Sequence, residues 1–152
     1  MLLKNKAVVL TGSNRGIGKR ILEIFSANGA KVFACVRDDN DNFKSYIEEI
    51  ENKTKNKIFL VKLDLTNDNE IKNSANKIIS SKIPIDVLIN NAGIIHTSIF
   101  QMTSIKKFKE IFEVNFFSQA LFTQYVLKAM IKNKKGSIVN ISSTSGMDSN
   151  FG

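Results

Sequence analysis

Short apolar runs and stretches of helical periodicity alternate along this chain. A short apolar run bounded by polar residues or glycine predicts a buried strand, and apolar side chains that recur every three or four residues predict a helix. The runs predict five strands, at residues 7–10, 31–36, 58–63, 87–89 and 137–141. The stretches between them predict four helices: about 17–27, about 42–55, one that starts after Thr66 or Asn67, and a long one from Thr103 or Ser104 to about Lys132.

Strands and helices in alternation predict a parallel sheet with helices on both of its faces. Right-handed crossover connections then give the strand order 3-2-1-4-5 of a doubly wound, Rossmann-like α/β fold. No internal repeat or low-complexity linker interrupts the pattern. We therefore expect residues 1–152 to form a single dinucleotide-binding domain.

The first strand leads into a glycine-rich turn. Residues 7–18 have the sequence AVVLTGSNRGIG, with glycines at 12, 16 and 18. A strand, a glycine turn and a helix in this order form a phosphate site, because the missing Cβ atoms let the backbone approach a pyrophosphate at the helix N-terminus. The spacing is G-x-x-x-G-x-G rather than G-x-G-x-x-G, and Ser13 and Arg20 exclude a P-loop. A glycine-rich turn without a ligand is the alternative interpretation.

Polar or small residues follow all five predicted strands. They lie at 11–18, 37–38, 64–65, 90–93 and 142–145. Ligands of doubly wound sheets bind outside the carboxyl ends of the strands, so these residues are expected to surround one site. Each cluster alone could equally be a turn or a helix cap, but all five together favour a site.

Three of these segments resemble the short-chain dehydrogenase/reductase family. They are Thr11-Gly12-x-x-x-Gly16-x-Gly18, the N-N-A-G sequence of residues 90–93, and the strand 136–143, which is similar to the one that carries the family's catalytic serine. The resemblance covers essentially the whole chain but only the N-terminal part of the family's fold, which predicts a C-terminally truncated domain. The cofactor-binding residues that it implies are Gly12, Ser13, Asn14, Arg15, Gly16, Ile17, Gly18, Asp64, Leu65, Asn91, Ala92 and Gly93.

The resemblance also implies two catalytic residues. Asn115 matches the helix asparagine of the family's catalytic set, and its aromatic neighbours suggest a buried amide with a specific partner. Ser143 matches the serine that forms a hydrogen bond with the substrate oxygen, with Ser142 as the alternative. The family's acid/base is the tyrosine of a Tyr-x-x-x-Lys motif, which these 152 residues do not contain. We therefore expect the 152-residue chain alone to be inactive.

The end of the second strand indicates the cofactor. Arginine there accommodates the 2′-phosphate of NADP, whereas an acid binds the ribose 2′-hydroxyl of NAD. Arg37 follows the position of the family's acid, and Arg15 lies in the glycine turn, so NADP(H) is favoured over NAD(H). Asp38 and Asp39 are the opposing observation, because a shift of two residues would place an acid at the ribose.

The predicted function is that of an NADP(H)-dependent oxidoreductase acting on a carbonyl/alcohol pair, free or bound to an acyl carrier. The nearest subfamily is 3-oxoacyl-acyl-carrier-protein reductase, from the loop sequence and Arg37. A non-catalytic nucleotide-binding module, or an inactive fragment, is the alternative. Oligomers are common in the family, and we expect the full-length form to be a homo-oligomer. The apolar positions of the long helix could serve that interface or pack on the sheet.

Composition excludes several other classes of protein. The net charge is +8, but the lysines are scattered and no nucleic-acid-binding motif accompanies them, so we expect no nucleic-acid partner. The single cysteine predicts neither a disulfide framework nor a metal site. No apolar run is long enough for a transmembrane helix, and Lys4 and Lys6 interrupt the start of the chain. We expect a cytoplasmic protein without membrane contact.

Overall fold

The computed structural model describes residues 1–144 and contains one parallel sheet of five strands. Its order is β3-β2-β1-β4-β5, which confirms the predicted topology. The strands are β1 (Ala7–Thr11), β2 (Lys31–Val36), β3 (Ile58–Lys62), β4 (Val87–Asn90) and β5 (Ser137–Asn140).

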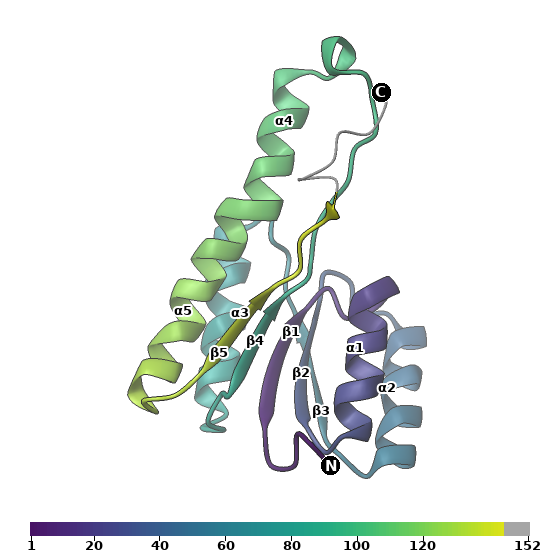
Figure 1. The fold of residues 1–152 in the computed structure, drawn as a ribbon, viewed down its shortest axis with the longest axis vertical. Coiled ribbons are helices and arrows are strands. Elements are labelled where there is room, and N and C mark those ends of the chain that lie inside the picture. Colours follow the sequence, from purple (N-terminus) through teal and green to yellow (C-terminus); the bar gives the residue numbers. More distant parts are fainter. Residues whose placement is uncertain (145–152) are drawn as a thin grey trace.

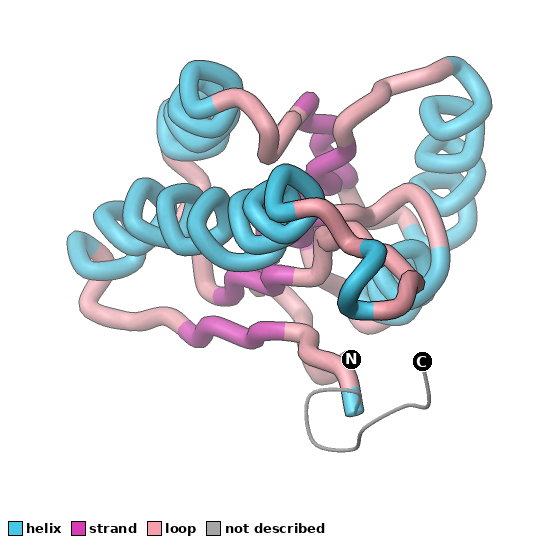
Figure 2. The backbone as a smooth tube through the Cα atoms, turned by 90° about the horizontal axis from the view of Figure 1, so that it is seen from above, coloured by secondary structure: helices cyan, strands magenta, loops and turns pink. Residues whose placement is uncertain are grey.

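Helices cover both faces of the sheet (Figure 1). They are α1 (Gly16–Ala27), α2 (Asp41–Thr54), α3 (Asp68–Ser80), α4 (Ile105–Phe112) and α5 (Ser118–Lys132). In Figure 1, α1 and α2 lie on one side of the strands and α3 and α5 on the other, and the view from above in Figure 2 shows the same layers. Helix α4 extends past the ends of the strands, beyond the two packed layers.

The strand residues alternate between two hydrophobic cores, because successive side chains of a strand point to opposite faces. Val9 and Phe33 pack in the core that contains the buried residues of α3 and α5. Val8 and Val32 pack in the other core, against the apolar faces of α1 and α2. Both faces of the central strands are thus buried against helices, which explains their continuous apolar sequence.

The amino end of the sheet is held by one buried carboxylate. Asp86, immediately before β4, accepts a hydrogen bond from the backbone N–H of Ala7 at 3.0 Å. It also pairs with Lys6 at 3.2 Å and with Lys135 at 3.1 Å. These contacts join the starts of β1, β4 and β5 to one side chain.

The predicted long helix is correct in extent but not in regularity. A 3₁₀ turn (Phe100–Met102) precedes α4, and a π-helical turn, η2 (Glu113–Phe117), separates α4 from α5. The N–H of Ser118 bonds to the carbonyl of Glu113, five residues back. Such π turns often occur at functional sites, and this one contains Asn115.

Strand β5 forms the exposed edge of the described sheet. All four of its residues are exposed, and it pairs only with β4. The aromatic side chains of Phe112 and Phe116 on the long helix are also exposed, whereas Phe122 of α5 is fully buried in the core. The apolar positions of the long helix therefore divide into a face on the sheet and a face on solvent.

Candidate functional site

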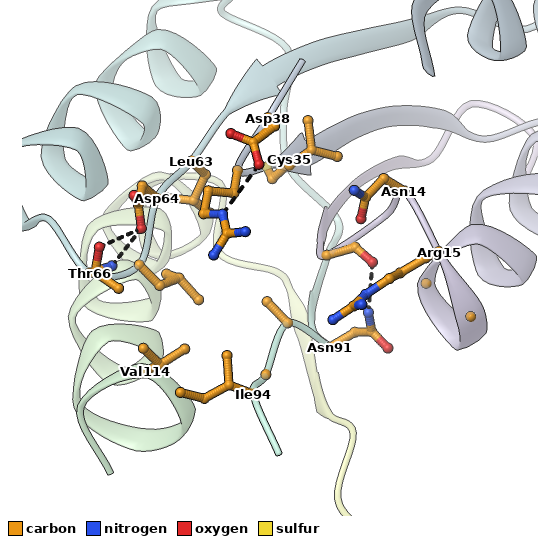
Figure 3. A pocket seen from close by; sticks show the side chains of 18 of the residues that line it. Asn14, Arg15, Cys35, Asp38, Leu63, Asp64, Thr66, Asn91, Ile94 and Val114 are labelled. Atoms are coloured by element: carbon orange, nitrogen blue, oxygen red, sulfur yellow. Dashed lines mark hydrogen bonds and ion pairs between the residues drawn. The ribbon is translucent and has the colours of Figure 1, made fainter. Parts of the chain in front are cut away.

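A cleft of about 670 Å³ lies at the carboxyl ends of the strands (Figure 3). In the view of Figure 3, side chains such as Arg15, Asp64 and Val114 border it from three directions. The sequence-predicted residues that line it are Gly12, Asn14, Arg15, Gly16, Ile17, Gly18, Arg37, Asp64, Leu65, Asn91, Ala92 and Gly93. The structure thus brings the ends of four strands together at one cleft.

Two glycines are required by the packing of the turn after β1. Gly12 has φ +67°, and a Cβ there would lie 2.9 Å from the Cα of Ala92. A Cβ on Gly18 would overlap the carbonyl oxygen of Gly12. Glycine therefore lets the turn, the start of α1 and the segment after β4 pack at backbone distance.

Ser13 does not line the cleft, although the resemblance placed it among the cofactor residues. It is fully buried, and its hydroxyl donates to the carbonyl of Cys35 at 3.3 Å. The backbone N–H groups of Gly12 and Ser13 bond to the same carbonyl. Ser13 therefore ties the glycine turn to the end of β2.

The N-terminus of α1 has no side-chain cap. Asn40, Asn67 and Ser104 cap α2, α3 and α4 with side-chain oxygens, but Arg15 at the N-cap of α1 makes no such bond, and the first turn holds no acidic residue. The first N–H groups of a helix lack intrahelical partners, and their partial positive charge favours an anion. This helix end, which borders the cleft, is suited to a phosphate group.

Thr11 and Asn91 fix the segment after β4 to the glycine turn. The N–H groups of Asn91 and Ala92 both donate to the hydroxyl of Thr11 at 2.9 Å. The side-chain amide of Asn91 donates to the carbonyls of Thr11 at 3.0 Å and of Gly12 at 3.1 Å. The two loops that line the cleft are thereby held as one unit.

Asn90 connects the same region to the edge of the sheet. Its buried amide nitrogen donates to Thr123 on α5 and to Asn140 on β5, both at 2.9 Å. These contacts connect β4, through Asn90, to β5 and to α5.

Arg37 and Asp64 lie at the end of the cleft formed by β2 and β3. Arg37 is 67% exposed and pairs with the neighbouring Asp38 at 3.3 Å. Partial burial opposes ionisation of Asp64, but two hydrogen bonds from Thr66 and the positive charge of Arg37 outweigh it and lower the pKa of the carboxyl. Asp64 is therefore ionised at neutral pH and already holds Thr66, while the guanidinium of Arg37 reaches toward solvent.

Asn115 has a specific partner but is not buried. Its amide oxygen accepts from the N–H of Ile94, and its amide nitrogen donates to the carbonyl of Ile94, both at 2.8 Å. The side chain is exposed, so the expected buried environment is wrong. The flanking aromatic residues Phe116 and Phe117 also face outward, and this is why an apolar neighbourhood in the sequence did not produce burial.

The two serine candidates follow β5. Ser142 and Ser143 are both exposed, and neither lines the cleft described above. Ser145, the last residue of the polar cluster expected after the fifth strand, lies outside the described residues. The structure thus places Asn115 against the cleft segment 92–95 and the serines beyond the edge strand.

Comparison with known proteins agrees with this geometry. The sequence model of the family described as "short chain dehydrogenase" matches residues 6–152. The 3-oxoacyl-[acyl-carrier-protein] reductase FabG of Aquifex aeolicus is 36% identical over 150 residues, and dehydrogenase/reductase SDR family member 7B of Danio rerio is 34% identical over 149. The matches cover 99% and 95% of this chain.

The chain belongs to the short-chain dehydrogenase family. It spans 60% of the length of the Aquifex relative and 48% of that of the Danio relative. A metagenomic short-chain oxidoreductase in complex with NADP has a TM-score of 0.88 at 27% identity, covering 99% of this chain and 67% of the other. Actinorhodin polyketide ketoreductase with NADPH has a TM-score of 0.86 at 26% identity, covering 95% and 56%.

Two polar side chains that organise the cleft were not predicted from the sequence. Thr11 counted only as part of the glycine motif, and Gln119 was not considered at all. A hydroxyl at the last position of an otherwise apolar strand was an available signal for Thr11. Gln119 gives no such signal, because its partners depend on the π turn, which hydrophobic periodicity does not reveal.

The described part of the chain contains no cluster of side chains suited to a metal ion. None of its helices within residues 1–144 is long and apolar enough to cross a membrane. Cys35 borders the cleft at the end of β2, but it is fully buried, and burial raises the pKa of its thiol to about 12. The thiol therefore stays protonated at neutral pH and contributes packing rather than reactivity.

Proposed function

We propose that this chain binds NADP(H) in the cleft and forms the cofactor-binding part of an oxidoreductase that acts on a carbonyl/alcohol pair. The observation that carries the proposal is the N-terminus of α1, which has no side-chain cap and lies beside the glycine turn. A Cβ at position 18 would block this turn, and Arg37 lines the same cleft. The arrangement fits a dinucleotide: an anion site for the pyrophosphate, and a cation for a further phosphate. When bound, the nicotinamide supplies or accepts the hydride.

Arg37 supports the preference for NADP(H) over NAD(H). Its guanidinium is exposed at the cleft and pairs with the equally exposed Asp38. Exposed ion pairs contribute little, so the guanidinium can exchange this contact for a 2′-phosphate at small cost. Two of the structural relatives described above are complexes with NADP or NADPH, which supports the same choice.

Asn115 and Ser143 are the residues that we propose for the substrate side. Asn115 holds the segment around Ile94 against the helix, and the hydroxyl of Ser143 would donate a hydrogen bond to the substrate oxygen. The FabG relative favours a 3-oxoacyl group on a carrier protein as the substrate. The exposed side chains of Phe112 and Phe116 are suited to contact a second copy in the full-length protein.

The second candidate function is a nucleotide-binding module without turnover, and the two tyrosines favour it for the 152-residue chain. Tyr46 donates a hydrogen bond to Glu23 between α1 and α2, and burial together with that contact raises the pKa of its hydroxyl. Tyr125 packs against the core on α5. Neither tyrosine lines the cleft, so we expect this chain to bind cofactor but not to oxidise or reduce a substrate by itself.

Fluorescence titration with NADPH and with NADH tests the proposal. We expect NADPH to bind about ten times more tightly than NADH, and Arg37→Glu to weaken NADPH binding about tenfold or more while leaving NADH almost unchanged. Arg20→Glu is the matched control, because Arg20 is an exposed arginine of α1 outside the cleft. Equal binding of both cofactors by the unchanged chain would overturn the NADP(H) preference, and absence of binding would overturn the proposed function.

A further inference from the structure

Gln119 makes an unusual set of contacts at the start of α5. Its amide nitrogen donates to the carbonyl of Ala92 at 2.5 Å and to the carbonyl of Asn115 at 3.4 Å. Ala92 lines the cleft, and Asn115 belongs to the π turn. One side chain therefore joins the cleft loop after β4 to the irregular part of the long helix.

The orientation of this amide is fixed by its partners. Both partners are carbonyl oxygens, which only accept hydrogen bonds, so the nitrogen must face them. The amide oxygen of Gln119 is buried and has no hydrogen-bond partner among the described residues. Leaving a buried acceptor unpaired costs free energy, so the hydrogen bonds donated by the nitrogen must hold this side chain in place.

Gln119 completes a row of polar contacts along residues 91–94. Thr11 accepts from the N–H groups of Asn91 and Ala92, Gln119 donates to the carbonyl of Ala92, and Asn115 pairs with both backbone groups of Ile94. Gln119 and Asn115 are four residues apart, so both reach the loop from one side of the helix. Without Gln119, the loop would keep its contact with β1 but lose one of its two anchors on the helix.

We propose that Gln119 is a positioning residue that holds the cleft loop 91–94 and the π-turn carbonyl of Asn115 in their binding geometry. It acts through Ala92 and Asn115, with no contact of its own to a bound molecule. The effect on cofactor affinity rests on the proposed function, because it requires that the cleft bind NADP(H). The effect on the loop itself does not.

Gln119→Glu is the sharpest variant, because it keeps the size of the side chain and replaces the donor by an acceptor. A carboxylate would face two carbonyl oxygens, so we expect the affinity for NADP⁺ at pH 7.5 to fall about tenfold. A protonated carboxyl can donate again, so the ratio of variant to unchanged affinity should recover as the pH is lowered to about 5. A role in packing alone would produce no such pH dependence.

Gln119→Leu and Gln124→Leu form the control pair. Gln124 is an exposed glutamine on the same helix, and it does not line the cleft. Gln119→Leu should weaken NADP⁺ binding at every pH, whereas Gln124→Leu should change nothing. Thermal unfolding without cofactor verifies that each variant is folded at the temperature of the titration.

Hydrogen exchange gives a readout that does not depend on the cofactor. The N–H of Ile94 donates to Asn115, so its exchange reports whether the loop is held against the helix. We expect this amide to exchange about tenfold faster in Gln119→Leu, with the amides of β1 and β2 unchanged. Unchanged exchange at Ile94 would overturn the positioning role, even if NADP⁺ fails to bind to any form of the chain. If the unchanged chain binds NADP⁺ and both Gln119 variants bind it equally well, the role in affinity is also refuted.

Discussion

Strands β1 and β5 differ sharply in burial and in the number of strands with which each pairs. All five residues of β1 are buried, and the strand pairs with a neighbour on each side. All four residues of β5 are exposed, and it pairs on one side only. The loop after β1 contributes the glycine turn, and β5 leads to the proposed catalytic serine. The part that we propose to bind cofactor is thus closely packed within the described residues, whereas the part that would meet substrate is largely exposed.

This difference supports a division of the proposed function between the two regions. A cofactor cleft needs backbone held at close distance, and the buried hydroxyl of Thr11 and the glycines at 12 and 18 supply that. A substrate site needs side chains enclosed from water, and Asn115 and Ser143 are both exposed. We therefore propose that the residues of this chain bind the cofactor by themselves, and that catalysis requires further groups in addition to them.

The largest expected effect on the packed side is that of Gly18→Ala. The new Cβ would overlap the carbonyl oxygen of Gly12 and lie 2.5 Å from the amide nitrogen of Asn91. Both groups are fixed, so we expect the free energy of unfolding to fall by about 3 kcal/mol and NADPH binding to be lost. Urea denaturation followed by circular dichroism measures the first effect.

Gly16→Ala is the control for that variant. A Cβ at position 16 meets nothing within 4 Å, so only the strain of its positive φ remains, about 1 kcal/mol. If both variants lost the same stability, close packing of the glycine turn would not be the reason for Gly18.

A matched pair of valines compares the two strands directly. Val9 of β1 is fully buried, whereas Val139 of β5 is 42% exposed. Val9→Ala should lower the free energy of unfolding by about 2.5 kcal/mol through lost burial and a cavity, and Val139→Ala by about 0.5 kcal/mol. Equal losses in urea denaturation would show that β5 is covered in solution, and would contradict the difference in burial between the two strands.

The smallest of these effects concerns the contact that joins the two strands, and it depends on pH. Partial burial opposes ionisation of Asp86, but hydrogen bonds from Ala7, Lys135 and Lys6 outweigh it and lower the pKa of the carboxyl. A lowered pKa gives stability that is present above about pH 4 and is lost as the pH falls through the folded-state value. Asp86→Asn should cost about 2 kcal/mol at pH 7 and flatten this acid dependence.

The exposed Asp39 provides the control for Asp86. Asp39→Asn should leave both the stability at pH 7 and its acid dependence unchanged, because this side chain is exposed and outside the sheet. Denaturation midpoints measured between pH 3 and pH 7 distinguish the two variants. An acid dependence in Asp86→Asn equal to that of the unchanged chain would contradict the assignment.

Much of the fold could be predicted from the sequence, because burial imposes a simple pattern. The second strand, Lys31–Val36, agrees residue by residue, and the helix expected at about 42–55 is observed at Asp41–Thr54. Asn67, one of two expected caps, accepts from the N–H groups of Asn69 and Glu70. Strand order followed from the handedness of crossovers, which does not depend on any particular residue.

The site could be predicted less completely, because its geometry depends on contacts between distant segments. Periodicity predicts that a helix spans Glu113–Phe117 but not that its hydrogen bonds shift by one residue there. Ser13 follows the motif yet turns inward, because the carbonyl of Cys35 is within its reach. The side chain of Asn115 forms its hydrogen bonds with the backbone of Ile94, a loop residue that no sequence pattern indicated. Motifs thus indicated the segments that line the cleft, whereas the individual hydrogen bonds depend on contacts that the sequence does not reveal.

We propose above all that the cleft between the ends of β1, β2, β3 and β4 is a site for NADP(H). The most direct test is a titration of the ¹⁵N-labelled chain with NADP⁺, followed by amide chemical shifts. We predict saturable shifts at Gly12, Gly16, Arg37 and Ala92, with β5 residues such as Val139 little affected. Shifts confined to the exposed aromatic face of α4 and the π turn, or no shifts at millimolar NADP⁺, would contradict NADP(H) binding in the cleft.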